Sequence, residues 1–228
     1  MASGGTQPGE AKLILNGKVL DDGAVVAAVR GAKITPVVSQ GCRPIGEPFV
    51  ITKAERNEIF ELGGHKAHDQ LKAIYDRLPN RDKELMRLGI HLGRVVNEYQ
   101  DSFEYGNFLI RNVTGMNAED GSVLVGDYFR AGQTVQFHVR DASTASEDLN
   151  QLLNKSRERE DAAAKACLLF TCNGRGMRLF EDPHHDASTV RKQLGGVPAA
   201  GFFCQGEIGP ISGVNFLHGF TASMALFY

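Results

Sequence analysis

The segment LLFTCNGRG, residues 168–176, joins an apolar run of strand length directly to a cysteine and two glycines. A short apolar run that ends at turn residues is typical of a buried strand, and glycine permits backbone conformations that other residues avoid. The segment therefore predicts a strand over 166–172 that carries Cys172 into a loop shaped by Gly174 and Gly176. Two interpretations stay open: the loop holds a reactive or ligand-contacting group, or the chain only turns a corner there.

Two other segments share this composition, GCRPIGEP at 41–48 and CQGEIGPISG at 204–213. Neither contains the Gly-Lys-Ser/Thr of a phosphate-binding loop or the glycine spacing of a dinucleotide site, and Ser212 stands one position too late for a nucleophile elbow. Glycine-rich loops can present backbone N–H groups to a ligand, and strands of one sheet can bring their ends together. The three loops therefore predict a shared pocket, and the alternative interpretation is three separate tight turns.

The charged residues of these loops indicate what such a pocket would bind. Arg43 and Arg175 would pair with a ligand carboxylate, which a guanidinium can bind through two parallel hydrogen bonds. Glu47 or Glu207 would then accept the hydrogen bonds of a ligand amine. The predicted ligand-binding residues are Arg43, Glu47, Cys172, Asn173, Gly174, Arg175, Gly176, His184, Gly206 and Glu207.

Catalytic and metal sites are weaker interpretations of the same residues. A guanidinium near Cys172 would favour its thiolate, and His184 is the nearest histidine that could act as its base, but we identify no third residue to orient them. His184-His185-Asp186 resembles a metal-binding sequence, yet adjacent side chains point apart and no third ligand stands at helical spacing. We therefore expect no catalytic residue and no metal site, and we expect Asp186 to cap a helix.

The composition describes an ordinary soluble globular protein. The chain has 228 residues, of which 42% are apolar and 23% charged, and its formal net charge is −2. This balance gives no reason to expect binding to nucleic acid or to a membrane. The four cysteines form no C-x-x-C pair, which favours reduced thiols, and the beginning of the sequence lacks the pattern of a secretory signal. We expect a cytoplasmic protein.

The order of apolar and amphipathic stretches predicts an α+β fold with mixed, mostly antiparallel sheets covered by a few helices. Asn16-Gly17 predicts a hairpin within 12–29, and 42–48 is expected to be a loop. Expected helix caps are Asn80, Ser143 or Thr144, and Asp186. The expected strands are 32–41, a pair within 48–64, 90–99, 107–115, 122–127, 134–142, 166–172, 199–204 and 216–228, and the expected helices are 65–79, 80–88, one that begins at 143 or 144, and 186–195.

The sequence resembles the FIST family, which contains paired FIST N- and C-domains. The resemblance rests on VVSQGCRPIGEPFVIT (37–52), GNFLIRNVTG (106–115), VGDYFRAGQTVQFHVRDA (125–142), LLFTCNGRG (168–176), LFEDPHHDAS (179–188) and AGFFCQGEIGPISGVNFLHGFTAS (200–223). It implies a flexible leader at 1–11, the C-terminal remnant of an N-domain at 12–52, a C-domain at 53–208 and a closing strand segment of the same fold at 209–228. Most of the N-domain would be absent, which would expose apolar surface to a second copy or another protein.

The resemblance also implies a function. Members of the family are associated with sensing small ligands in signal transduction, amino acids having been suggested, and they accompany signalling modules in bacteria and F-box modules in eukaryotic ubiquitin-ligase adaptors. We therefore expect a non-enzymatic intracellular module that binds a small ligand, with a signalling or ubiquitin-ligase protein, or a second copy in a homodimer, as its partner. The alternatives are a protein-interaction adaptor, a thiol-based sensor at Cys172, and a haem sensor with His138, His184 or His218 as axial ligand, although no cofactor is the main expectation.

Overall fold

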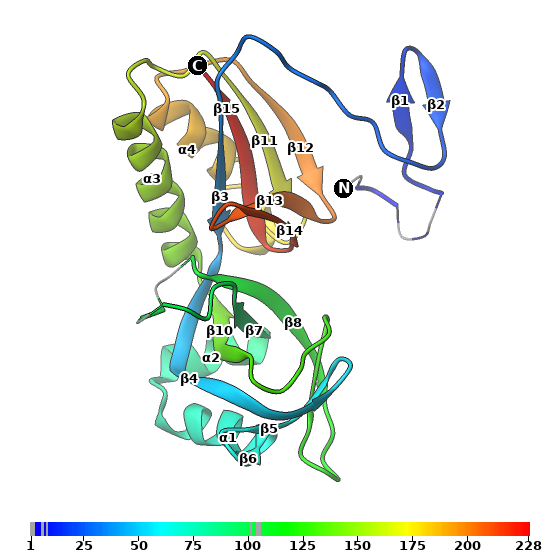
Figure 1. Ribbon diagram of the computed structural model, residues 1–228. Helices are drawn as coiled ribbons and strands as arrows, with labels where there is room; N and C mark the ends of the chain where they lie inside the picture. Colours follow the sequence, from blue (N-terminus) through cyan, green and yellow to red (C-terminus); the bar gives the residue numbers. More distant parts are fainter. Residues whose placement is uncertain (1–2, 6, 8, 101, 104–105) are drawn as a thin grey trace. The chain divides into compact units, whose positions relative to one another are not determined.

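The computed structural model describes residues 3–5, 7, 9–100, 102–103 and 106–228, and this part of the chain contains four α-helices and fifteen β-strands (Figure 1). It divides into two compact units. The first, called the sheet unit here, comprises 1–40, 146–210 and 215–228, and the second, called the barrel unit, comprises 41–145 and 211–214. The predicted leader at 1–11 lies partly outside the described residues.

The sheet unit is built on a four-stranded sheet with the strand order β12-β11-β15-β3. β11 and β12 are parallel, whereas β15 runs antiparallel to both β11 and β3. Apolar side chains of α3 and α4 pack on the sheet in one buried cluster that includes Val37, Leu149, Val190 and Met224. The elements of this unit are β1 (Leu13–Leu15), β2 (Lys18–Leu20), β3 (Ile34–Gln40), most of α3 (Ala142–Arg159), β11 (Ala166–Cys172), α4 (His185–Gln193), β12 (Ala199–Cys204), most of β13 (Glu207–Ile211), most of β14 (Val214–His218) and β15 (Thr221–Phe227).

The barrel unit is a closed antiparallel sheet. Its strands follow the order β4-β10-β7-β8-β9-β5-β6, and an additional pairing between β4 and β5 closes the sheet on itself. Alternate residues of β10, such as Val135, Phe137 and Val139, belong to the apolar core, as the two-residue period of a strand requires. The elements are β4 (Cys42–Glu55), β5 (Glu58–Leu62), β6 (His65–Lys66), α1 (Ala67–Arg77), α2 (Asn80–Leu88), β7 (Ile90–Val95), β8 (Phe108–Met116), β9 (Val123–Val125) and β10 (Thr134–Arg140).

The expected α+β class with mostly antiparallel sheets is confirmed. The hairpin at Asn16-Gly17 and the expected strand pair within 48–64 are also observed. The second pair turns at Arg56-Asn57, and Asn16 and Arg56 have positive φ angles of 51° and 54°. None of the helices in the described residues is long and apolar enough to cross a membrane.

The prediction of a loop at 42–48 is wrong, because β4 runs through this segment. Pro44 pairs with His138 of β10, and among the described residues β4 pairs on its other side with β5 alone, from Ile51 onward. A proline lacks a backbone N–H and is tolerated where a strand has a neighbour on one side only. Gly46, with a φ of 64°, adjoins the register shift between Val135 and Phe137. Proline and glycine therefore indicate here a strand that pairs on one side and has an irregular register, and not a loop.

A second predicted loop and a predicted strand also differ from the structure. Within 204–213, residues Glu207–Ile211 form β13, which pairs with β14 in a hairpin. The expected strand at 216–228 is interrupted between His218 and Thr221, where Phe220 has a φ of 65°. Glycine and proline in the sequence thus marked a short hairpin and not an open loop.

The helices are where they were expected, but their caps are not. Pro79 precedes the first residue of α2, so that Asn80 lies inside the helix. Helix α3 begins at Ala142, and Asp141 before it accepts a hydrogen bond from the backbone N–H of Ser143 at 3.1 Å. Asp186 lies in the first turn of α4 and its carboxylate makes no cap, because it is engaged elsewhere. Sequence patterns located the helices correctly and misassigned the capping residues at their N-terminal ends.

The substitution Gly46→Ala tests the close packing of β4 against Ile74 in the barrel unit. A Cβ at this position would lie 2.7 Å from Cδ1 of the buried Ile74, and the positive φ adds backbone strain. We expect Gly46→Ala to lower the free energy of unfolding by about 2–4 kcal/mol, as the sum of left-handed strain and overpacking. Gly132→Ala is the matched control, because Gly132 has a φ of 88° and no atom of the described residues within 4 Å of an added Cβ. Urea unfolding measures both, and equal losses would contradict the packing argument.

Candidate functional site

The parallel pairing of β11 and β12 brings two of the three predicted loops together. Cys172 and Cys204 are register partners at the ends of these strands, and the backbone N–H of Asn173 donates to the carbonyl oxygen of Cys204 at 2.7 Å. Arg43 and Glu47, from the third predicted loop, belong to β4 of the barrel unit. Of the ten predicted ligand-binding residues, these two therefore lie in the barrel unit and the other eight lie in the sheet unit.

Arg175 forms a buried ion pair with Asp186. Its side chain has no exposed area, and its Nε and Nη2 donate to Oδ2 and Oδ1 of Asp186 at 2.7 and 2.8 Å. The Arg175 guanidinium also lies 5.2 Å from the ring centroid of Phe180, which stacks on His185 at 3.6 Å. The guanidinium that was expected to bind a ligand carboxylate is therefore bound by a carboxylate of the same chain.

This ion pair controls the ionisation of Asp186. Burial alone raises the pKa of a carboxyl, but the hydrogen bonds from Arg175 and His185 outweigh it and lower the pKa of Asp186 to about 2. The Nε2 of His185 lies 3.0 Å from Oγ of Ser146 on α3. The first turn of α4 is thus connected both to the loop after β11 and to α3.

A cavity of about 240 Å³ lies on the same side of the sheet as these contacts. It is bounded by β11, the edge strand β12 and the first turn of α4. The lining residues are Leu169 and Thr171 from β11, Gly176 from the following turn, Pro183, His184, Asp186 and Ala187 around the start of α4, and Ala199–Phe203 from β12. Of the residues predicted from the sequence, Gly176 and His184 line this cavity, and Arg175 supports it through Asp186.

Thr171 is the polar group of this cavity that sequence reasoning missed. Its residue is 5% exposed, and its Oγ1 has no hydrogen-bond partner among the described residues. Successive side chains of a strand point to opposite faces, so Thr171 lies on the face of Leu169, while Cys172 lies on the other. A hydroxyl within the apolar run LLFTC was the available signal in the sequence.

The cysteine face of the strand pair contains a second buried carboxylate, Glu207. Its Oε2 accepts hydrogen bonds from Oγ1 and the backbone N–H of Thr221 at 2.9 and 3.4 Å, and its Oε1 has no partner within the described part of the chain. Burial raises the pKa of Glu207, and the bonds from Thr221 oppose that shift. The Sγ of Cys172 accepts a hydrogen bond from the backbone N–H of Gly174 at 3.3 Å, and burial raises the pKa of Cys204.

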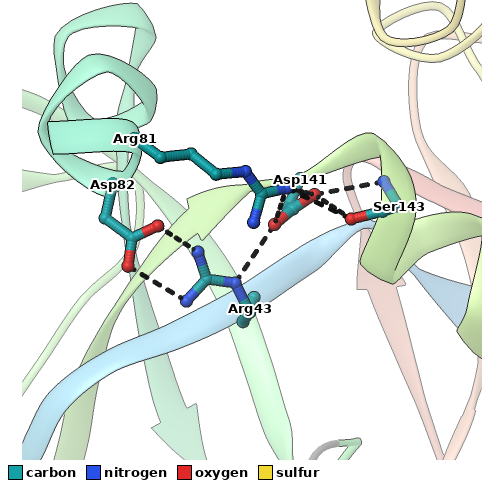
Figure 2. A network of polar contacts seen from close by, with 5 residues as sticks. All are labelled: Arg43, Arg81, Asp82, Asp141 and Ser143. Atoms are coloured by element: carbon teal, nitrogen blue, oxygen red, sulfur yellow. Dashed lines mark hydrogen bonds and ion pairs between the residues drawn. The ribbon is translucent and has the colours of Figure 1, made fainter. Parts of the chain in front are cut away.

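The second predicted arginine, Arg43, is also engaged within the chain, as Figure 2 shows. Its Nη2 lies 2.6 Å from Oδ1 of Asp82, and its Nε lies 3.2 Å from Oδ2 of Asp141. Asp141 also accepts from Nη2 of Arg81 at 2.9 Å and from Oγ of Ser143 at 2.8 Å. This network ties β4 to α2 and to the start of α3, and it lowers the pKa of Asp141 through hydrogen bonds that outweigh the effect of burial.

The remaining candidates have simple environments. Glu47 is exposed, with its Oε1 4.0 Å from Nη1 of Arg77. His138 is buried in the barrel unit, where its Nδ1 lies 2.9 Å from the carbonyl oxygen of Gln136, and burial lowers its pKa to about 4. The Nε2 of His218 lies 2.9 Å from the carbonyl oxygen of Gly209. No group of three or more potential metal ligands occurs among the residues that the structure describes.

These observations define an α+β protein of two compact units whose sheet unit contains a small, mostly apolar cavity beside a buried ion pair. Residues 1–65 match the FIST N domain, and residues 67–210 match the FIST C domain. The chain belongs to the FIST family, which confirms the resemblance found in the sequence. FIST domains are generally associated with sensory functions and signal transduction.

Curated relatives come from mycobacteria. Uncharacterized protein Mb0898c of Mycobacterium bovis and uncharacterized protein Rv0628c of Mycobacterium tuberculosis are each 44% identical to this chain over 227 residues. The alignments cover 100% of this chain and 59% of each relative. The two family matches meet at 65–67, within the barrel unit, and the predicted boundaries at 52–53 and 208–209 stay predictions.

Asp186→Asn tests the buried ion pair. The substitution leaves the Arg175 charge buried without a counter-charge, and we expect it to lower the free energy of unfolding by about 3–5 kcal/mol, the usual cost of breaking such a pair. Glu181→Gln is the control, because Glu181 is an exposed carboxylate five residues earlier in the chain. Guanidinium unfolding followed by circular dichroism measures both variants. A loss below about 1 kcal/mol for Asp186→Asn would show that the pair does not hold the unit together.

Asp148 gives the sheet unit an unusual pH dependence. Its Oδ2 accepts hydrogen bonds from Oγ of Ser39 at 2.7 Å and from the backbone N–H of Gln40 at 2.9 Å. Burial nevertheless raises the pKa of Asp148 to about 6, above its ordinary value of 3.8. The folded state therefore holds the proton more tightly than the unfolded state does, which stabilises the fold at low pH.

The expected pH profile follows from this sign. The contribution of Asp148 is fully present below pH 3.8 and is lost as the pH rises through about 6, which amounts to about 3 kcal/mol. Asp148→Asn should remove this part of the profile, whereas Glu147→Gln, at the exposed neighbouring position, should leave it unchanged. Denaturant unfolding at intervals between pH 4 and 8 measures the effect. Identical slopes in the wild type and Asp148→Asn would refute the assignment.

Proposed function

We propose that this chain is a non-enzymatic sensory module that binds a small ligand in the cavity between β11, β12 and α4. The observation that carries the proposal is the unpartnered hydroxyl of Thr171 in an otherwise mostly apolar cavity of about 240 Å³. Small-molecule sites are concave and mostly apolar, with a few polar groups that orient the ligand. A buried hydroxyl without a partner costs free energy, and a ligand that bonds to it recovers that cost.

A binding role accounts for the surrounding residues better than catalysis does. Arg175 and Asp186 bind each other, and Cys172 accepts a hydrogen bond from its own loop. Burial raises the pKa of Cys167 to about 11 and also raises that of Cys204, which keeps both thiols protonated at neutral pH. Of these groups only Asp186 lines the cavity, and none of them is arranged as an activated nucleophile.

The sensory output and the cytoplasmic location that the resemblance implies are parts of the same proposal, and amino acids, which the resemblance also suggests, are among the ligands to be tested. The mycobacterial relatives are longer than this chain, which spans 59% of their length. A signalling partner or additional sequence would convert binding into output. Haem is not part of this proposal, because a cavity of about 240 Å³ is below the roughly 300 Å³ at which sites for larger ligands begin.

An adaptor that binds another protein, or a second copy of this chain, is the second candidate function. It is favoured by β12, which pairs on one side only in the described part of the fold and is exposed from Ala199 to Phe203. Phe202 and Phe203 are 52% and 45% exposed. An exposed edge strand can accept a strand of another chain. A ubiquitin-ligase component is the partner that the family resemblance suggests for this candidate.

Thermal unfolding with a panel of amino acids and small organic acids tests the proposed function. A ligand at about one hundred times its dissociation constant should raise the melting temperature by about 5–10 °C. Ala187→Trp, which fills the cavity from α4, should abolish this shift, whereas Ser188→Trp at the next exposed position should retain it. The absence of any shift across the panel would reject the sensory proposal and favour the adaptor.

A further inference from the structure

We propose that the cavity selects small carboxylates, with the carboxylate head at Thr171 and the first turn of α4 and the apolar body against β12. This inference rests on the proposed function, because it names the class of ligand for the same cavity. Four features carry it: the free donors at the start of α4, the buried Thr171 hydroxyl, the balance of charge around Asp186, and the apolar wall.

The first turn of α4 supplies donors for an anion. The first backbone N–H groups of a helix have no acceptor within the helix, and the helix dipole makes this end partially positive. Asp186 and Ala187 of this turn line the cavity. His184 at the N-cap makes no side-chain capping bond, and Asp186, which the sequence suggested as the cap, is bound to Arg175. Asp182 takes two donors of the helix start, since its Oδ1 accepts from the N–H of His184 at 2.8 Å and its carbonyl oxygen accepts from the N–H of His185 at 3.2 Å. The N–H groups of Asp186 and Ala187 are the donors that the described part of the chain leaves for a ligand.

Thr171 is the independent second observation. It faces the same side of the sheet as Leu169, lines the cavity, and is 5% exposed. No described residue is hydrogen-bonded to its Oγ1. A threonine hydroxyl can donate to a carboxylate oxygen, and a hydrogen bond to a charged group is stronger than one between neutral groups. The hydroxyl and the helix start face the cavity from β11 and from α4, so that one small anion can contact both.

The charges around the cavity favour an anion over a zwitterion. Asp186 is the charged residue of the lining, and its carboxylate is offset by two hydrogen bonds from the Arg175 guanidinium. The Nη1 of Arg175 is buried without a hydrogen-bond partner among the described residues, and Arg175 also interacts electrostatically with Asp148. A ligand ammonium would have to compete with Arg175 for Asp186. The structure therefore offers more to a carboxylate than to an amine.

The apolar wall of the cavity determines which ligand bodies fit. Leu169, Ala199, Ala200 and the phenylalanines at 202 and 203 give the cavity its apolar surface. A volume of about 240 Å³ equals that of about eight water molecules, at roughly 30 Å³ each. Carboxylates with a short branched or aromatic body, on the order of eight to ten non-hydrogen atoms, match this space.

A matched set of ligands tests the head group. 4-Methylpentanoate has the required size, leucine adds an ammonium group to the same skeleton, and 4-methylpentanamide replaces the carboxylate with a neutral group of equal shape. Isothermal titration at fixed ionic strength should give a dissociation constant at least about tenfold lower for the carboxylate than for the other two. Equal binding of the amide, or tighter binding of leucine, would overturn the inference. If all three fail while another ligand of the thermal panel binds, the proposed function stands and this inference falls.

Thr171→Val tests the hydroxyl without changing the shape of the side chain. The variant should weaken 4-methylpentanoate binding about tenfold, which corresponds to the loss of one charge-assisted hydrogen bond. The unliganded variant should also melt at a higher temperature than the wild type, because a buried hydroxyl without a partner has been removed. Thr134→Val, on β10 of the barrel unit, is the control and should leave binding unchanged. Unchanged binding in Thr171→Val, or a lower melting temperature, would contradict the proposal.

Discussion

The ion pair between Arg175 and Asp186 is the interaction on which the arrangement of the sheet unit depends. Both side chains are removed from water, and two short hydrogen bonds join them. A buried charge is tolerated only where its partner is fixed, so the pair determines where the loop after β11 meets the first turn of α4. Gly176 follows Arg175 with a φ of 57°, which lets the chain turn beside the ring of Phe203. The cavity lies between these elements because the pair holds them there.

Both arginines that the sequence offered as ligand contacts are bound within the protein, and this shows a general difficulty. Arg43 pairs with carboxylates 39 and 98 residues away, and Arg175 pairs with one 11 residues away. An arginine beside glycines at the end of a strand has the same local sequence whether it binds a ligand or stabilises the fold. Its burial and its partner decide between the two roles, and both are properties of the folded chain. Arg175 therefore supports the cavity through its bond to Asp186, whereas Thr171 lines the cavity directly.

Local sequence patterns were sufficient to predict single strands and helices. The apolar runs at 166–172 and 199–204 are β11 and β12, and the helix expected at 65–79 is α1, whose buried residues are Ala67, Leu71 and Ile74. The β4–β5 hairpin was expected as a strand pair within 48–64, but the pairings of β10 with β4 and of β9 with β5 that complete the barrel could not be predicted. They depend on which strands become neighbours and not on the period of any one strand. The cavity could not be predicted for the same reason. Thr171 becomes significant only when β12 and α4 are placed around it.

The two family matches and the two compact units divide the chain at different positions. The pairing of strands explains this difference. The N-domain match ends at residue 65, yet its strand β3 pairs in register with β15, from Thr221 opposite Gln40 to Phe227 opposite Ile34. Its strand β4 pairs with β10, which lies in the C-domain match. Each compact unit therefore contains strands from both family domains. In this chain, strands of the N-domain match and strands of the C-domain match belong to the same sheets. β11, which lines the cavity and lies in the middle of the four-stranded sheet, is consequently connected through β15 to β3, a strand of the N-domain match.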